Sequence, residues 1–87
     1  MVRLAIPASW TWTGNEVHIH AEEDGKPILC RITQAVLRDH WGNPRGADQC
    51  LRAARNNAAL IEAIAVRLIS TKRLEADGSV LIRTSDV

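Results

Sequence analysis

The strictest constraint in the sequence is the segment from Glu16 to Thr33, which predicts two strands around the turn pair Asp24-Gly25. An Asp-Gly pair between two alternating runs favours a two-residue type I′ hairpin. With Glu23 opposite Lys26, one face pairs only apolar residues, namely Ala21 with Ile28, Ile19 with Cys30 and Val17 with Ile32. The other face pairs Glu22 with Pro27, His20 with Leu29 and His18 with Arg31. A shift by one residue would mix the two faces, so the register is well specified.

The segment from Ala47 to about Thr71 predicts one long amphipathic helix, because it contains no Gly or Pro and its apolar residues recur at helical spacing. The apolar arc covers about half of the circumference, which is more than one packing partner requires. We therefore expect this helix to lie between a sheet and a second helix. Asn57 lies near the centre of the arc, and a buried amide without partners costs about 1–3 kcal/mol. We expect its side chain to bond to a neighbouring loop backbone.

The remaining signals complete a β-β-α-α-β order in a single domain spanning residues 1–87. Thr33 is a good N-cap for a short helix that Gly42 and Pro44 end. Asp77-Gly78 is a second turn signal, and a strand follows it. We expect an α+β fold with a three-stranded antiparallel sheet of order 1-2-3 and two helices packed on one face. The segment from Val2 to Ile6 is the candidate for an extra N-terminal strand.

The N-terminal half of the long helix presents alanines on its apolar face, which leaves a shallow groove beside Ala54, Asn57 and Ala58. The chain has three Trp and neither Phe nor Tyr, so its aromatic bulk is concentrated in few side chains. We expect Trp41, together with Trp12, to fill this groove. If the groove is open to solvent, it becomes the first place to look for a ligand.

Composition excludes several classes of protein. The formal net charge is +1, which removes the main argument for a nucleic-acid-binding domain. The sequence has no apolar run of the roughly 20 residues that a membrane span needs, so we expect a cytoplasmic protein without membrane association. Cys30 and Cys50 lack a CxxC motif and a His at zinc-ligand spacing, so we read both as reduced core residues.

The sequence offers weak candidates for chemistry. His18 and His20 lie on one strand face with Glu16, and such a set can chelate a transition metal. Arg31 opposes His18 in the predicted register, which favours a solvated polar face or a subunit interface instead. Asp39 and His40 are helix neighbours that do not face each other. We therefore expect no metal, no cofactor and no catalytic residues, and a protein that is not an enzyme.

Several motifs in order carry a resemblance to a known family. They are DGKPILCRIT, then DHWG, then IEAIA in the long helix, and finally DGSVLIRTSD. From Glu16 to Asp86 the chain resembles domain-of-unknown-function family 1488, a group of small bacterial proteins. The resemblance implies a compact α+β domain of a bacterial cytoplasm. It implies no activity, catalytic residue or cofactor.

We therefore expect a small non-enzymatic protein-interaction or regulatory module with an unknown protein partner, or a homodimer formed through the outer sheet face. The residues predicted for that face are His18, His20, Leu29, Arg31, Leu81 and Arg83. The alternative is a nucleic-acid-binding domain that uses the same face. This alternative is less favoured, because the strands contribute no aromatic residue to the face and an acidic turn borders it.

Overall fold

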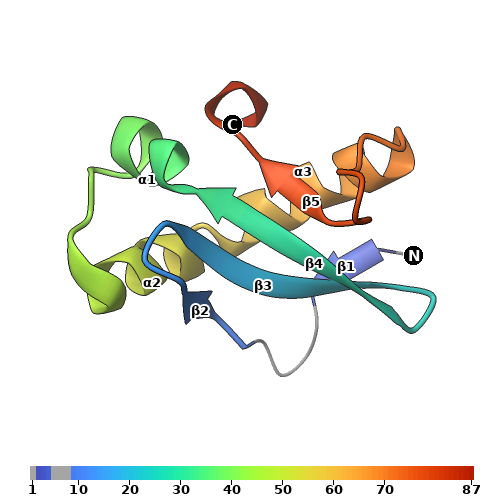
Figure 1. Ribbon diagram of the computed structural model, residues 1–87, viewed down its shortest axis with the longest axis horizontal. Coiled ribbons are helices and arrows are strands. Elements are labelled where there is room, and N and C mark those ends of the chain that lie inside the picture. The colour runs from blue at the N-terminus through green and yellow to red at the C-terminus, as the bar shows by residue number, and fades with distance from the viewer. Residues whose placement is uncertain (1, 5–8) are drawn as a thin grey trace.

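Strands β3 (Glu16–Glu23) and β4 (Lys26–Thr33) form the central antiparallel hairpin of the computed structural model, which describes residues 2–4 and 9–87 (Figure 1). Every strand pair predicted from the sequence is present, from Val17 with Ile32 to Glu23 with Lys26. The turn residues Asp24 and Gly25 have φ angles of 53° and 82°. Two successive positive φ angles are the conformation that a type I′ turn requires. The predicted hairpin and its register are confirmed.

Three shorter strands complete a five-stranded sheet with the order β1-β3-β4-β5, in which β2 also pairs with β3. They are β1 (Val2–Leu4), β2 (Thr11–Trp12) and β5 (Val80–Ile82). The predicted N-terminal strand exists over Val2–Leu4, and its last two predicted residues lie outside the described residues. The expected α+β class is confirmed, whereas the three-stranded sheet is wrong. Strand β2 has only two residues and therefore shows no alternation that a sequence could reveal.

Strand β5 runs parallel to β4, although the sequence predicted an antiparallel meander. Helix α1 (Gln34–His40) has 7 residues and is about 10 Å long. This is too short to cross back along β4, whose 8 residues span about 26 Å. The chain therefore returns along the sheet only once, through the helices that follow α1, and β5 runs in the same direction as β4, beside its C-terminal half (Figure 1).

The predicted long helix is divided at Asn57 into α2 (Gly46–Asn56) and α3 (Ala58–Ser70). The Asn57 side-chain nitrogen Nδ2 donates to the carbonyl oxygen of Ala53 at 2.8 Å, and its backbone N–H donates to that of Ala54 at 3.0 Å. A side chain that takes up the carbonyl four residues earlier competes with the helix's own hydrogen bonds. The single helix and the expected bond from Asn57 to a loop are both wrong for this reason.

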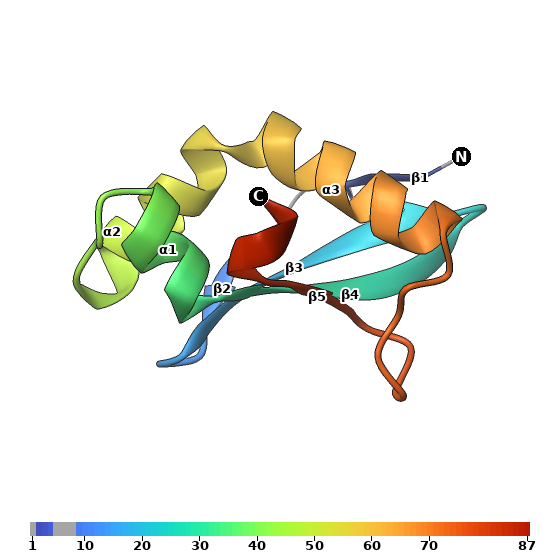
Figure 2. The ribbon, with the colours of Figure 1, turned by 90° about the horizontal axis from the view of Figure 1, so that it is seen from above.

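The three helices and the 3₁₀ turn η1 (Thr84–Asp86) lie on one side of the sheet, and the other side is open (Figure 2). Between the layers lies a core whose sheet residues are Val17, Ile19, Ala21, Cys30, Ile32, Val80 and Ile82. The helices add Val36, Leu37, Cys50, Ala54, Ile61, Ile64, Ala65, Leu68 and Ile69. Both cysteines are free thiols in this core, as predicted.

Thr33 occupies the N-cap position of α1, as predicted, but its hydroxyl makes no capping bond. The hydroxyl oxygen is buried and has no hydrogen-bond partner among the residues that the structure describes. Trp10, Trp12 and Trp41 are half-buried and pack against the edge of the core. Over the described ranges, no helix is both long and apolar enough to cross a membrane.

Candidate functional site

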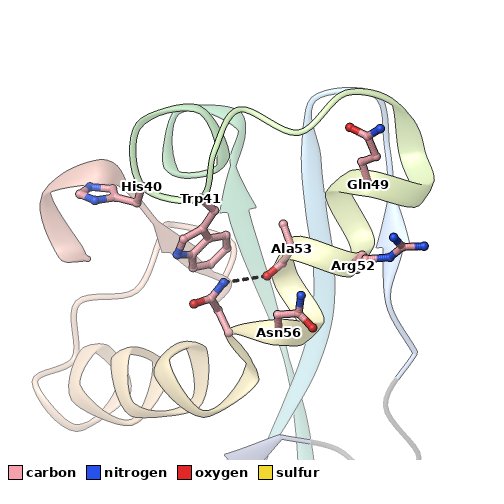
Figure 3. Close-up of a pocket in the computed structure, with 7 residues that line it drawn as sticks. His40, Trp41, Gln49, Arg52, Ala53 and Asn56 are labelled. Atoms are coloured by element: carbon pink, nitrogen blue, oxygen red, sulfur yellow. Dashed lines mark hydrogen bonds between the residues drawn. The ribbon is translucent and has the colours of Figure 1, made fainter.

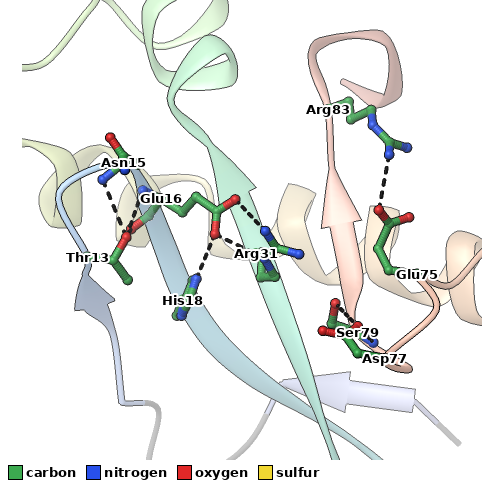
Figure 4. A network of polar contacts seen from close by, with 9 residues as sticks. All are labelled: Thr13, Asn15, Glu16, His18, Arg31, Glu75, Asp77, Ser79 and Arg83. Atoms are coloured by element: carbon green, nitrogen blue, oxygen red, sulfur yellow. Dashed lines mark hydrogen bonds and ion pairs between the residues drawn. The ribbon is translucent and has the colours of Figure 1, made fainter.

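The open face of the sheet carries a polar network centred on the Glu16 carboxylate (Figure 4). Arg31 donates to both carboxylate oxygens, from Nε to Oε1 at 3.0 Å and from Nη2 to Oε2 at 2.9 Å. His18 Nε2 lies 2.9 Å from Oε1. The hydrogen bonds from Arg31 lower the pKa of the Glu16 carboxyl, and Glu16 in turn raises the pKa of Arg31. The network therefore holds a charged carboxylate between the Arg31 guanidinium and the His18 ring.

Of the three candidate metal ligands, Glu16 and His18 belong to this network and His20 does not. Both oxygens of Glu16 accept from Arg31, which stands directly opposite His18 in the strand register. A guanidinium in this position occupies the oxygens that a metal ion would need and repels a second cation. His20 is exposed and pairs with Leu29 instead. Within residues 2–4 and 9–87, no three His, Cys, Asp or Glu side chains are grouped closely enough to hold a metal ion.

The other arginines of the open face also have carboxylate partners. Arg83 Nη2 lies 3.2 Å from Glu75 Oε1, and Arg3 Nε lies 3.9 Å from Glu22 Oε2. Leu29 and Leu81 are half-buried beside these charged groups. The fold thus brings His18, His20, Leu29, Arg31 and Leu81 together on one surface as the register predicted, with Arg83 just beyond β5. The guanidinium groups of this surface are largely neutralised by acidic neighbours.

The predicted groove residues do not share one open surface. Ala54 is fully buried in the core and Ala58 is half-buried. The other two predicted groove residues, Trp41 and Asn57, line a shallow hollow of about 410 Å³ together with His40, Gln49, Arg52, Ala53 and Asn56. Figure 3 shows the Trp41 indole beside Ala53, whereas the Arg52 side chain points away from it. Five of the seven lining residues are polar, but the Asn57 amide already donates to the Ala53 carbonyl oxygen.

Asp39 and His40 are turned toward different partners. The Asp39 carboxylate accepts from Arg38 Nε at 2.9 Å, and this bond lowers the pKa of Asp39. His40 Nε2 lies 3.2 Å from the carbonyl oxygen of Thr84. The two side chains make no acid–base pair with each other. They connect α1 to η1, because the Asp39 carboxylate also lies 3.5 Å from the Thr84 hydroxyl.

The surface that sequence reasoning missed is the solvent-facing side of α3. We call it the α3 outer face and define it by five exposed residues, Ala59, Leu60, Ala63, Val66 and Ser70. Leu60 and Val66 are 40% and 36% exposed, which places them among the few large apolar side chains that the described chain presents to solvent. The available signal was the apolar arc, which was wider than one packing partner requires.

The two charged residues of α3 bond to groups outside this face, although Arg67 is itself exposed beside it. Glu62 Oε2 accepts from the backbone N–H of Leu4 at 3.1 Å, which ties α3 to β1. Arg67 lies beside Ala63 on the helix, but its guanidinium donates to the carbonyl oxygen of Asp86 at 2.6 Å. Helix α1 packs against β4, α2 and η1 (Figure 2). The second helix that the sequence predicted over this arc is therefore not supplied by α1.

Comparison with known proteins agrees with this fold. The family model described as "Protein of unknown function (DUF1488)" matches residues 6–82. The structure is similar to the crystal structure of a protein of unknown function from the DUF1488 family of Shewanella loihica PV-4, with a TM-score of 0.79 and 20% sequence identity. That similarity covers 93% of this chain and 90% of the other. No curated protein matches the sequence.

Proposed function

Because the chain belongs to the DUF1488 family, whose description names no activity, we propose from its geometry that it is a small protein-interaction module. Its contact surface is the α3 outer face. The observation that carries this proposal is the exposure of Leu60 and Val66 on a helix that is apolar on both sides. A helix that is hydrophobic all round is normally covered all round. A partner that covered these side chains would gain roughly 25 cal/mol for each Å² of apolar surface removed from water.

The open sheet face is less suited to the same role. Glu16 binds Arg31 there through two hydrogen bonds, so docking an apolar partner would desolvate a charged pair. The cost of desolvating an ion pair often exceeds its Coulombic gain. An interface on this face, and nucleic-acid binding through it, stay predictions. Nucleic-acid binding would need free cations, whereas Arg31 and Arg83 already have carboxylate partners.

The compartment that fits this module is a bacterial cytoplasm. The buried free thiols of Cys30 and Cys50 support this placement, because cytoplasmic reductants keep thiols reduced. We place its action in contacts with other proteins rather than in chemistry at a pocket.

The test is site-specific photo-crosslinking in cells that produce the protein, with a benzophenone amino acid in place of one residue at a time. Positions 60 and 66 report on the α3 outer face. Position 74 is the matched control, because Leu74 is 38% exposed and lies beyond the helix. Position 81 reports on the sheet face.

We expect discrete adducts from positions 60 and 66 and none from position 74. Adducts confined to position 81 would contradict the proposal and favour the sheet face. If those adducts disappear on nuclease treatment, the partner is nucleic acid. The absence of adducts at all four positions would also count against an interaction module.

A further inference from the structure

We infer that the solvent-facing side of α2 and its N-cap is a second binding surface, whose ligand is an acidic segment of a partner protein. We call it the α2 arginine face and define it by six exposed residues, Arg45, Asp48, Gln49, Arg52, Arg55 and Asn56. These residues recur at helical spacing, so they share one side of the helix. The surface is separate from the α3 outer face, and the inference therefore goes beyond the proposed function.

The guanidinium groups of this face lack the partners that most other arginines have. A carboxylate or a carbonyl oxygen lies against the guanidinium groups of Arg3, Arg31, Arg38, Arg67 and Arg83. Within the described part of the chain, no ion pair or side-chain hydrogen bond is made by Arg45, Arg52 or Arg55, nor by Arg73 in the loop after α3. The unpaired guanidinium groups are therefore concentrated at α2, where three arginines share a face with one carboxylate, Asp48.

The amide side chains of the face add further donors. Gln49 Oε1 accepts from the backbone N–H of Arg45 at 2.9 Å, which leaves chiefly the amide NH₂ group to bond outward. Figure 3 shows Gln49, Arg52 and Asn56 in succession along α2. A carboxylate only accepts hydrogen bonds, and its bonds to guanidinium groups are among the stronger ones in proteins. A surface of guanidinium and amide donors therefore fits a ligand that carries carboxylates.

Two adjoining hollows give this face its shape. The first, of about 410 Å³, includes Trp41, and the second, of about 310 Å³, includes Arg55. Arg52 and Asn56 line both hollows and so form the ridge between them. A small ligand is normally enclosed in one concave pocket. Two shallow hollows on either side of an arginine fit an extended segment that places one side chain in each.

The charge pattern favours a protein segment over nucleic acid. Asp48 lies one helical turn before Arg52, so a carboxylate interrupts the cations where a phosphate backbone would run. A peptide carries backbone N–H donors that tolerate a carboxylate nearby, and a phosphate backbone has none. The formal net charge of the whole chain is only +1, whereas nucleic-acid-binding domains usually show a marked basic excess.

The test is an NMR titration of the isotope-labelled full chain with a hexaglutamate peptide at low ionic strength. This probe has no apolar side chain, so it does not report on the α3 outer face. We expect shifts concentrated in the side-chain N–H signals of Gln49, Arg52 and Asn56. The side-chain amide of Asn15, in the turn before β3, is the control signal and should not move. Hexaglutamine, which has the same length and no charge, should move none of these signals.

Paired variants decide whether the α2 arginine face is the site. Arg52→Gln combined with Arg55→Gln should weaken hexaglutamate binding roughly tenfold, since each exposed ion pair changes an equilibrium constant by up to about fivefold. Arg73→Gln is the matched control, because it removes an unpaired guanidinium outside the face and should leave the affinity almost unchanged. Circular dichroism checks that both variants fold.

Equal weakening by the two variants, or no binding of hexaglutamate to the parent chain, overturns the inference. A thymidine hexanucleotide that binds more tightly than hexaglutamate, and that loses affinity in R52Q/R55Q, also overturns it and assigns the face to nucleic acid. The crosslinks from positions 60 and 66 are a separate readout of the α3 outer face, so failure of one surface is distinguishable from failure of the other.

Discussion

The side-chain amide of Asn57 donates to the carbonyl oxygen of Ala53 at 2.8 Å, and the helical chain ends and restarts at this point. The break lets the two halves cover different parts of the sheet. Helix α2 packs against β2 and β3, whereas α3 packs against β1 and β5. The direction of α3, and with it the orientation of the α3 outer face, is therefore set at the break where Asn57 makes this bond.

Replacing Asn57 tests this dependence. Asn57→Asp keeps the shape but removes the donor and sets a carboxylate oxygen against the Ala53 carbonyl oxygen, so that two acceptors face each other. We expect the free energy of unfolding to fall by about 1–2 kcal/mol. Asn57→Ala should cost less, because alanine's higher helix propensity offsets part of the lost bond. Urea denaturation measures both, and an N57D variant as stable as the parent would show that the bond does not support the break.

Glu16 should make stability depend on pH. Its folded-state pKa is lowered, chiefly by Arg31, so its contribution is fully present above its ordinary pKa of about 4.5. That contribution is lost as the pH falls through the lower folded-state pKa. We expect Glu16→Gln to cost at most about 1 kcal/mol at pH 7 and progressively less at acidic pH.

The control for this experiment is Glu22→Gln. Glu22 is more exposed and lies at 3.9 Å from Arg3, so its loss should have almost no effect. Chemical denaturation at several pH values gives both comparisons. A cost for E16Q that is the same at pH 3 and pH 7 would show that the ion pair is not its source.

The two native thiols should be unreactive in the folded protein. Burial raises the pKa of Cys30 to about 11 and also raises the pKa of Cys50, so few thiolates are present near neutral pH. We expect a thiol reagent to label the native chain roughly 100-fold more slowly than the urea-unfolded chain. Counting labelled thiols by mass spectrometry checks this. Rapid labelling of one residue would place it outside the core.

The sequence predicted the hairpin well because its information is local. The pair Asp24-Gly25 defines the turn, and the apolar face from Val17 to Ile32 permits one register only. The parallel direction of β5 could not be predicted in this way. It depends on where the chain crosses the sheet, which the strand sequence does not contain. The crossing follows from the shortness of α1 and from the path of α2 and α3.

The candidate surfaces were also predicted only where the information is local. Periodicity placed His18 and Arg31 opposite each other on the open face, and the structure agrees. The bond from Arg31 to Glu16 was not predicted, because it depends on side-chain conformations. The width of the apolar arc agrees with the exposure of Leu60 and Val66 on the helix that carries them. The sequence predicted that a second helix covers this arc. Helix α1 does not do so, because it packs beside α2 and η1 instead.

The central claim is that the α3 outer face is the surface through which this chain contacts another protein, and crosslinking from position 66 tests it most directly. The parent chain should give discrete adducts, and Leu60→Glu should weaken them roughly tenfold or more, because the contact would bury an unpaired carboxylate. Leu81→Glu, on the sheet face, should leave the adducts unchanged. Adducts that L81E abolishes and L60E does not would contradict the claim.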